Sequence, residues 1–221
     1  IMLSSYSVYR AMVMPASFLV VLFYAIYLVV RNGVISYQKA SGLAMFSGIV
    51  IFCFYSFIRL KEMLPVEEYG YDAIFFILLI LCFAWGGDTC AYFAGRAFGK
   101  HKLCPVVSPK KTVEGAVGGV LGTMVFGVLV TVIYSIAADR MEEFTRSNIG
   151  VSMYVIIALL ACVAAVLGIY GDLFASVVKR QCGIKDYGTI FPGHGGILDR
   201  FDSVMFIAPF VTMVVIAAFY N

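Results

Sequence analysis

The sequence predicts an all-α, polytopic integral membrane protein with about six transmembrane helices in this chain. Of its 221 residues, 62% are hydrophobic and only 13% are charged, and the mean hydropathy is +0.96. A soluble domain carries about 25% charged residues, roughly twice this fraction. The apolar residues also gather into six segments, each near the ~20 residues with which a helix crosses a bilayer. Short loops join the segments without a low-complexity linker or a separable soluble domain, so we expect one membrane-embedded bundle.

The six expected spans follow one another along the chain. The first three run from Ala11 to Val30, from Gly42 to Ile58 and from Ala73 to Gly95, and the second is the shortest. The other three run from Val113 to Ala137, from Val151 to Gly171 and from Phe201 to Tyr220. The chain starts Ile1-Met2 without the basic region or cleavage site of a signal peptide, and this start is compatible with a fragment that lacks earlier spans.

Small residues inside the spans are interpreted as packing residues. Gly115, Gly118, Gly119 and Gly122 form two overlapping Gly-x-x-x-Gly pairs on the fourth span, a pattern typical of close helix packing. The six cysteines are scattered, with no Cys-x-x-Cys, so we interpret them as small buried residues rather than as a disulfide or zinc framework.

The loop charges predict an orientation in the membrane. The loops after spans one, three and five carry eleven of the 16 Lys and Arg residues: Arg31, Lys39, Arg96, Lys100, Lys102, Lys110, Lys111, Lys179, Arg180, Lys185 and Arg200. By the positive-inside rule, this side faces the cytoplasm. The net charge of +3 is too small, and the cations lie too close to apolar spans, to indicate a nucleic-acid partner.

The charged stretch between the last two spans carries the first candidate site. Asp172, Ser176, Lys179 and Arg180 fall on one face if the fifth span continues as a helix. Asp199 and Asp202, three residues apart, are expected to share a face at the start of the next helix. Three carboxylates suit Mg²⁺, which takes hard oxygen ligands. The alternative is that they cap the helix and pair with Arg180 or Arg200.

A glycine-rich loop, Phe191-Pro192-Gly193-His194-Gly195-Gly196, precedes these two aspartates. Glycines allow a backbone to approach a phosphate and turn N–H groups toward it, but an ordinary interhelical turn explains them equally well. His194 either contacts a phosphate or caps the turn, and we do not assign it as a base.

A second charged region joins spans three and four. Lys110 and Lys111 stand between Ser108 and Thr112, a composition that suits a polyphosphate. Upstream, Asp88, Tyr92, Gly95 and Arg96 share one helical face. A positive-inside loop explains the lysines alone, but it does not explain Asp88 and Glu114 at the edges of the spans.

Together these residues resemble a known signature. One pattern runs from Ser176 to Asp202 and reads Ser176-x-x-Lys179-Arg180-x4-Lys185-Asp186-x-Gly188-x2-Phe191-Pro192-x-His194-Gly195-Gly196-x-x-Asp199-Arg200-x-Asp202. It looks like the signature of the phosphatidate cytidylyltransferases, or CDP-diacylglycerol synthases. The segments Asp88…Ala91-Tyr92…Gly95-Arg96 and Ser108-Pro109-x-Lys111-Thr112-x-Glu114-Gly115 resemble the same family. The resemblance covers about residues 75 to 205 and is most specific in the last 30.

The resemblance implies an enzyme that joins CTP and phosphatidate to give CDP-diacylglycerol and pyrophosphate. It places N-terminal transmembrane helices in residues 1–72 and a catalytic transmembrane domain in residues 73–221, with the active site facing the cytoplasm from a bacterial-type inner membrane. It implies Mg²⁺ on Asp172, Asp199 and Asp202, and K⁺ as a second cation. The expected catalytic phosphate contacts are Lys179, Arg180, Lys111 and Arg200, and the expected substrate-binding residues are Ser176, Ser108, Lys110, Thr112, Lys185, His194, Gly195, Gly196, Asp88 and Tyr92.

Other functions remain open at this stage. A cation or proton transporter would use intramembrane carboxylates, but it predicts acids in the middle of spans rather than at their ends. An archaeal-type lipid cytidylyltransferase is an alternative among enzymes, whereas the Asp-Gly-x-x-Ala-Arg pattern of CDP-alcohol phosphotransferases is absent. Membrane lipids are expected partners and a homodimer is left open.

Overall fold

The chain folds almost entirely into helices. The computed structural model describes residue 15 and residues 18–30, 36–140, 150–189 and 195–219. It divides into two compact units, residues 1–51 and 52–221, which we describe separately. The predicted division at residue 72 stays a prediction.

The first unit contains an apolar helix at Phe18–Val30 and the first part of α2 (Tyr37–Met63). The second unit contains the rest of α2, a short helix α3 (Val66–Tyr69), and the long helices α4 (Asp72–Phe98), α5 (Val113–Arg140) and α6 (Val151–Gln181). The 3₁₀ helix η1 (Leu198–Arg200) and helix α7 (Val204–Phe219) complete it. Two short strands, β1 (Lys102–Cys104) and β2 (Ser108–Thr112), form an antiparallel hairpin between α4 and α5.

The predicted polytopic helical membrane fold is confirmed. Among the described residues, α2, α4, α5 and α6 are long and apolar enough to cross a membrane, and two apolar helices, Phe18–Val30 and α7, are shorter. Two details differ from the expectation. The hairpin was not predicted, and α7 begins at Val204 rather than Phe201 because η1 and a turn precede it.

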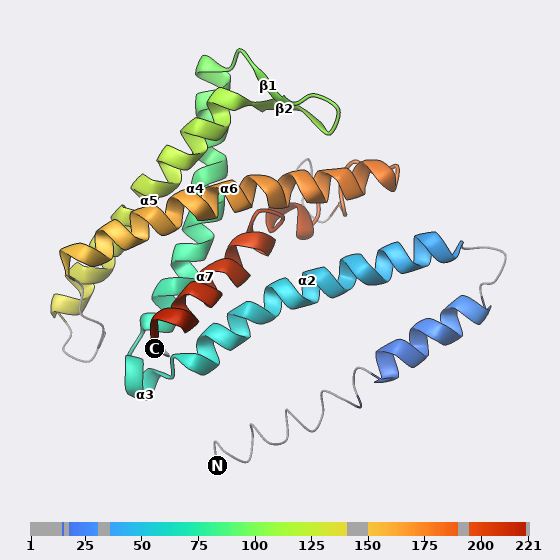
Figure 1. Ribbon diagram of the computed structural model, residues 1–221, viewed down its shortest axis with the longest axis horizontal. Coiled ribbons are helices and arrows are strands. Elements are labelled where there is room, and N and C mark those ends of the chain that lie inside the picture. The colour runs from blue at the N-terminus through green and yellow to red at the C-terminus, as the bar shows by residue number, and fades with distance from the viewer. Residues whose placement is uncertain (1–14, 16–17, 31–35, 141–149, 190–194, 220–221) are drawn as a thin grey trace. The chain divides into compact units, whose positions relative to one another are not determined.

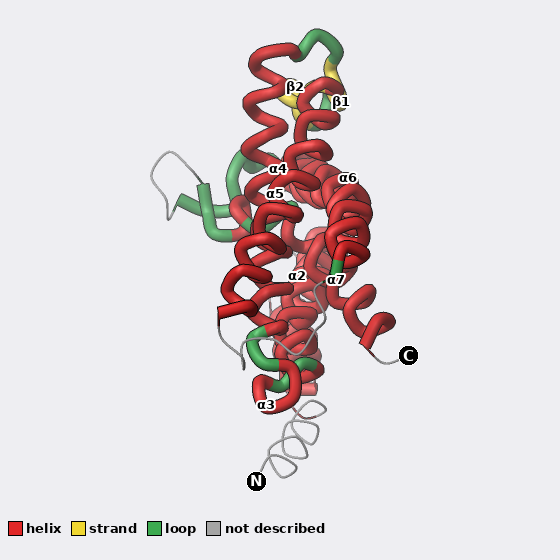
Figure 2. Tube along the Cα trace, turned by 90° about the vertical axis from the view of Figure 1, so that its left-hand side faces the viewer, coloured by secondary structure: helices red, strands yellow, loops and turns green. Residues whose placement is uncertain are grey.

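Helices α4 and α5 lie side by side and antiparallel, with the hairpin joining them at one end (Figures 1 and 2). Their contact depends on small residues: a Cβ added at Gly118 would overlap Ala94, and one added at Gly122 would overlap Cys90. This confirms the predicted role of the glycine pairs in close helix packing. The opposite face of α5 is apolar and exposed, as a lipid-facing surface requires, through Val117, Leu121, Val125 and Leu129.

The core of residues 52–221 holds α7 in the middle of the bundle. Val204, Ile207 and Val211 of α7 are at most 1% exposed, and they pack with Phe83 and Leu79 of α4 in a cluster that also includes residues of α6. Because α7 is anchored this way, the turn before it is fixed against α4 and α6. This turn carries Asp202.

Candidate active site

A polar cavity of about 520 Å³ lies within residues 52–221. Its wall comes from the last turns of α4, the hairpin, the start of α5, the second half of α6 and the η1 segment. This volume is in the range of small-molecule sites. The polar and charged side chains that line it are Asp88, Tyr92, Arg96, Lys110, Lys111, Thr112, Asp172, Lys179, Asp186, Asp199, Arg200 and Asp202.

The structure therefore brings the two charged regions of the sequence together. Lys111, on β2, forms an ion pair with Asp172, on α6. Each of these side chains is 25% exposed. Thr112, the next residue, is buried at the foot of the hairpin, where its hydroxyl accepts a hydrogen bond from the N–H of Gly115 at 3.1 Å. The hairpin is thus anchored to α5 while Lys111 reaches across the cavity.

A second ion pair closes the other side of the cavity. Lys179 Nζ lies 2.7 Å from Asp199 Oδ1, and the two side chains are only 12% and 5% exposed. The other oxygen of Asp199 accepts the N–H groups of Tyr187 (2.8 Å) and Gly196 (2.9 Å). Burial opposes ionisation of Asp199, but the hydrogen bond from Lys179 and these N–H groups outweigh it, so its pKa lies below the ordinary value.

The glycine-rich loop is built around this carboxylate. Gly195 has φ +83°, a left-handed conformation, and a Cβ there would lie 2.9 Å from Asp199 Oδ2. The Tyr187 hydroxyl donates to the Ala175 carbonyl of α6 at 2.9 Å. Burial, followed by the charge of Asp199, raises the pKa of Tyr187 to about 12, so its hydroxyl stays protonated.

Asp202 is almost buried and faces other carboxylates. It lies in the turn before α7, and its Oδ1 accepts the N–H of Ser203 at 2.9 Å. Burial, followed by the charges of Asp172 and Asp88, raises the pKa of Asp202 above the ordinary value. Three carboxylates from α4, α6 and this turn therefore act on one another electrostatically. A bound cation would relieve their repulsion.

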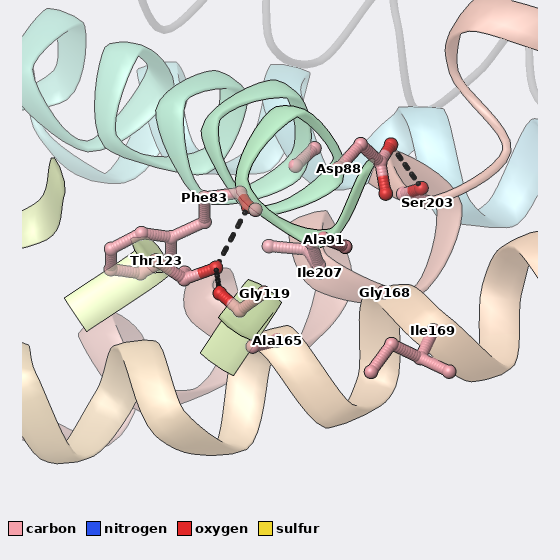
Figure 3. Close-up of a pocket in the computed structure, with 12 residues that line it drawn as sticks. Phe83, Asp88, Ala91, Gly119, Thr123, Ala165, Gly168, Ile169, Ser203 and Ile207 are labelled. Carbon is pink, nitrogen blue, oxygen red and sulfur yellow. Dashed lines mark hydrogen bonds between the residues drawn. The ribbon is translucent and has the colours of Figure 1, made fainter. Parts of the chain in front are cut away.

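Asp88 lines both the large cavity and a much smaller one, whose lining residues Figure 3 shows. Its Oδ2 accepts a hydrogen bond of 2.9 Å from the Ser203 hydroxyl, which fixes the start of α7 to α4. The smaller cavity, of about 20 Å³, has room for a single water molecule. Thr123 lines it, and its hydroxyl donates to the Gly119 carbonyl at 2.8 Å.

The placement of Asp199 and Asp202 differs from the expectation that they share a face at the start of one helix. Asp199 lies in η1, and Asp202 lies in the turn that separates η1 from α7. The Asp199 carboxylate accepts backbone N–H groups from the preceding loop, so this segment folds into a short 3₁₀ turn instead of the first turn of α7.

Not all of the expected catalytic and substrate-binding residues line the cavity. Among those that the structure describes, its wall does not include Ser108, Ser176, Arg180, Lys185, Gly195 or Gly196. The Ser176 hydroxyl is 3.4 Å from Asp172 Oδ1, which does line it. His194 lies outside the described residues. The roles assigned to these residues stay predictions.

Sequence reasoning missed several residues that build the site. Arg96 and Asp186 line the cavity but were not assigned a role, although both lie within the quoted motifs. The indole N–H of Trp85 donates to the Arg200 carbonyl at 3.0 Å, across 115 residues, and no sequence pattern signals this contact. The Glu114 carboxylate forms a hydrogen bond of 2.6 Å with the ring Nδ1 of His101 and accepts one of 3.0 Å from the backbone N–H of Lys100. It therefore holds the base of the hairpin.

Comparison with known proteins places the chain in a family. It is 32% identical over 198 residues to the phosphatidate cytidylyltransferase of Bacillus subtilis, a match that covers 90% of this chain and 66% of the relative. It is 39% and 42% identical over 145 residues to proteins of the same name from Staphylococcus haemolyticus and Staphylococcus epidermidis, which covers 66% of this chain and 50% of each relative. The chain thus spans about half to two thirds of the length of these relatives.

The family relationship extends further than the motifs indicated. The motifs cover about residues 75 to 205, whereas the sequence profile of the cytidylyltransferase family matches residues 1–218, including the first two expected spans. The chain belongs to the cytidylyltransferase family.

Proposed function

We propose that this chain is the catalytic part of an integral-membrane phosphatidate cytidylyltransferase, which joins CTP and phosphatidate to give CDP-diacylglycerol and pyrophosphate. One observation supports this most directly: the hairpin and α6 bring Lys111 and Lys179 to the same cavity as Asp172, Asp199 and Asp202. This combination of cations and carboxylates suits a polyphosphate with a divalent cation. The proteins it resembles carry the name of this activity.

The reaction requires positioning more than acid–base chemistry. An oxygen of the phosphatidate phosphate attacks the α-phosphorus of CTP, and the bond between that phosphorus and the bridging oxygen to the β-phosphate breaks. The phosphatidate phosphate is already an anion near neutral pH, because the second pKa of such monoesters is about 6. The site must therefore hold two polyanions together and stabilise the charge on the leaving pyrophosphate.

The lysines are suited to this role. Lys111 and Lys179 are partly buried and each is paired with a carboxylate, so both are held at the cavity wall before any ligand arrives. Charge-assisted contacts to phosphate oxygens are stronger than neutral hydrogen bonds. Arg200 and Lys110 line the same wall and add positive charge. We assign Lys111, Lys179 and Arg200 to the phosphates of CTP, with Arg180 nearby at the end of α6.

The carboxylates fit a magnesium ion. Among the described residues, no three Asp, Glu, His or Cys side chains are grouped closely enough to hold a metal together. Mg²⁺, however, usually takes one or two protein carboxylates and completes its shell with water and substrate phosphates. Asp172 and Asp202 would hold it, with Asp199 beside them, and K⁺ is proposed as a second cation. When bound, the metal would neutralise charge on the phosphates.

The setting of the reaction is part of the proposal. The positive-inside rule puts the cavity on the cytoplasmic side of a bacterial-type inner membrane. CTP would enter from the water, phosphatidate from the surrounding lipids, and a homodimer is the proposed assembly. The family relationship gives no support to a cation or proton transporter.

Purified full-length protein incubated with labelled CTP, phosphatidate and Mg²⁺ tests the proposal. We expect labelled CDP-diacylglycerol and an equal amount of pyrophosphate, neither of which forms when phosphatidate is left out. Omission of Mg²⁺ or its replacement by EDTA should also stop the reaction. Pyrophosphate released at the same rate without phosphatidate would show a CTP hydrolase, and would contradict the proposed transfer.

A further inference from the structure

The β1–β2 hairpin has a surface that faces away from the candidate active site. Because α4 and α5 both span the membrane, the hairpin that joins them must lie at a membrane surface, whichever side this is. Figure 1 shows it projecting sideways from the end of the α4–α5 pair rather than extending these helices. Its strands have three and five residues, so at ~3.3 Å per residue its tip stays within about 20 Å of the helix ends.

The charge of the hairpin has one sign. Residues 99–112 contain four lysines and no aspartate or glutamate. Lys110 and Lys111 line the cavity, but Lys100 and Lys102 are exposed and lie outside its wall. In the described part of the chain, no carboxylate forms an ion pair with Lys100 or Lys102. These two lysines are thus available to an anion from outside the protein.

The tip of the hairpin is apolar. Its turn reads Pro105-Val106-Val107, and Val106 is 91% exposed, the highest value for a large hydrophobic side chain among the described residues. An exposed valine in water is unfavourable, whereas one at the boundary between headgroups and acyl chains gains from burial. Lysines at the start of the hairpin and a valine at its tip are the combination by which interfacial segments bind anionic lipid.

We propose that the β1–β2 hairpin docks on the anionic phospholipid surface beside the cavity. Lys100 and Lys102 contact phosphate-bearing headgroups, and Val106 enters the boundary below them. The inner side of the same hairpin, with Leu103, Lys110 and Lys111, forms part of the cavity wall. An anionic lipid collected on the outer side is therefore close to the site, and this consequence rests on the proposed function.

Tryptophan fluorescence measures the docking directly, because Trp85 is the only tryptophan of the chain. A V106W/W85F protein is reconstituted into phosphatidylcholine vesicles with or without phosphatidylglycerol, and lipids brominated near the headgroup quench the introduced indole. We expect a blue-shifted emission and quenching that increase with phosphatidylglycerol. V106W with Trp85 retained, read as a difference from wild type, gives the same measurement if W85F does not fold.

Charge removal tests the lysines. K100Q/K102Q in the same background should reduce quenching in anionic vesicles to the level seen in phosphatidylcholine alone. K61Q is the matched control, since Lys61 is an exposed lysine in the last turn of α2 and should change nothing. Quenching by aqueous iodide but not by brominated lipid would overturn the proposal. Lipid quenching whose extent changes neither with phosphatidylglycerol nor in K100Q/K102Q would overturn it as well. The first result is also the one expected if the tip binds a protein partner.

Kinetics connect the docking to turnover. Each lysine near an anionic surface contributes about five-fold in binding, so K100Q/K102Q in the otherwise wild-type protein should raise the KM for phosphatidate by up to about 25-fold. The KM for CTP and the kcat at saturating phosphatidate should stay unchanged. Quenching is measured without turnover, so a failure of the docking proposal can be distinguished from a failure of the proposed function. Quenching without CDP-diacylglycerol formation would reject the proposed function alone, and normal turnover without quenching would reject the docking alone.

Discussion

At the scale of single residues, the aspartates of the cavity differ in what surrounds them. Asp199 is saturated by protein donors: Lys179, the N–H of Tyr187 and the N–H of Gly196. Asp202 accepts the N–H of Ser203 and otherwise faces the charges of Asp172 and Asp88. One carboxylate thus holds the loop in place, and the other is left to interact with a cation.

Asn substitutions should separate these two roles. D202N removes a buried charge that is repelled by its neighbours, so we expect turnover to be abolished while the melting temperature is unchanged or raised. In D199N the amide NH₂ replaces one carboxylate oxygen and faces either Lys179 or the N–H groups of Tyr187 and Gly196, all of which are donors. The lost charge-assisted hydrogen bonds are worth roughly 1.5–3 kcal/mol each. We therefore expect D199N to lose activity and melt at a lower temperature. Thermal unfolding and CTP turnover of the two variants, measured side by side, check this; near-normal turnover in D202N would contradict metal binding at Asp202.

At the scale of elements, the η1 segment is held from two sides. Lys179 and Tyr187 hold Asp199 on the α6 side, while Trp85 of α4 donates to the Arg200 carbonyl and packs edge-to-face with Phe201 at 5.7 Å. W85F keeps the aromatic contact but removes the N–H, which is worth about 0.5–1.5 kcal/mol. We expect kcat/KM for CTP to fall about two- to ten-fold in W85F, with little change in melting temperature.

The W85F result has a specific control. W85H keeps a ring N–H and should recover part of the activity, whereas W85L should be no better than W85F. If the indole only fills space, activity in all three variants will instead follow the loss of melting temperature.

The hairpin and α6 are coupled through their shared cavity. If Lys111 and Lys179 hold the same polyphosphate, K111M and K179M should each lower kcat/KM for CTP by about ten- to a hundred-fold. The double variant should deviate from additivity, because both lysines contact one ligand. K102M, on the same hairpin but outside the cavity, is the control and should keep its kcat/KM for CTP. Wild-type kinetics in K111M would remove the hairpin from the active site.

The helices could be predicted from the sequence where a long apolar run sets their position and length. The expected third, fourth and fifth spans coincide with α4, α5 and α6 because long apolar runs leave few alternatives. The hairpin was missed because its lysines also fit a topology signal. The surroundings of Asp199 were missed because its partners, Lys179 and Tyr187, are 20 and 12 residues away and come from different elements. The contact between Asp88 and Ser203 spans 115 residues, which no local pattern encodes.

At the scale of the whole molecule, the cavity requires that two loops lie on the same side of the membrane. The ion pair between Lys111 of the hairpin and Asp172 of α6 cannot form if the ends of α5 and α6 that carry them face opposite sides. The sequence predicts the same arrangement independently, because eleven of its 16 Lys and Arg residues follow the expected first, third and fifth spans. By the positive-inside rule, we expect this side to face the cytoplasm.

Cysteine labelling of intact cells and of opened membranes decides both points. After the six native cysteines are replaced by serine or alanine, a single cysteine is introduced at Lys110, at Lys185 or at Glu67 of α3; all three side chains are exposed. We expect an impermeant maleimide to modify positions 110 and 185 only when the cytoplasmic face is accessible, and position 67 in intact cells. The CTP turnover of each variant shows that the protein is inserted correctly.

Positions 110 and 185 reacting from opposite faces would contradict the shared cavity, because residues on opposite membrane surfaces cannot line one site. Both reacting in intact cells would keep the cavity but reverse its orientation, and CTP, which is made in the cytoplasm, could not reach it there.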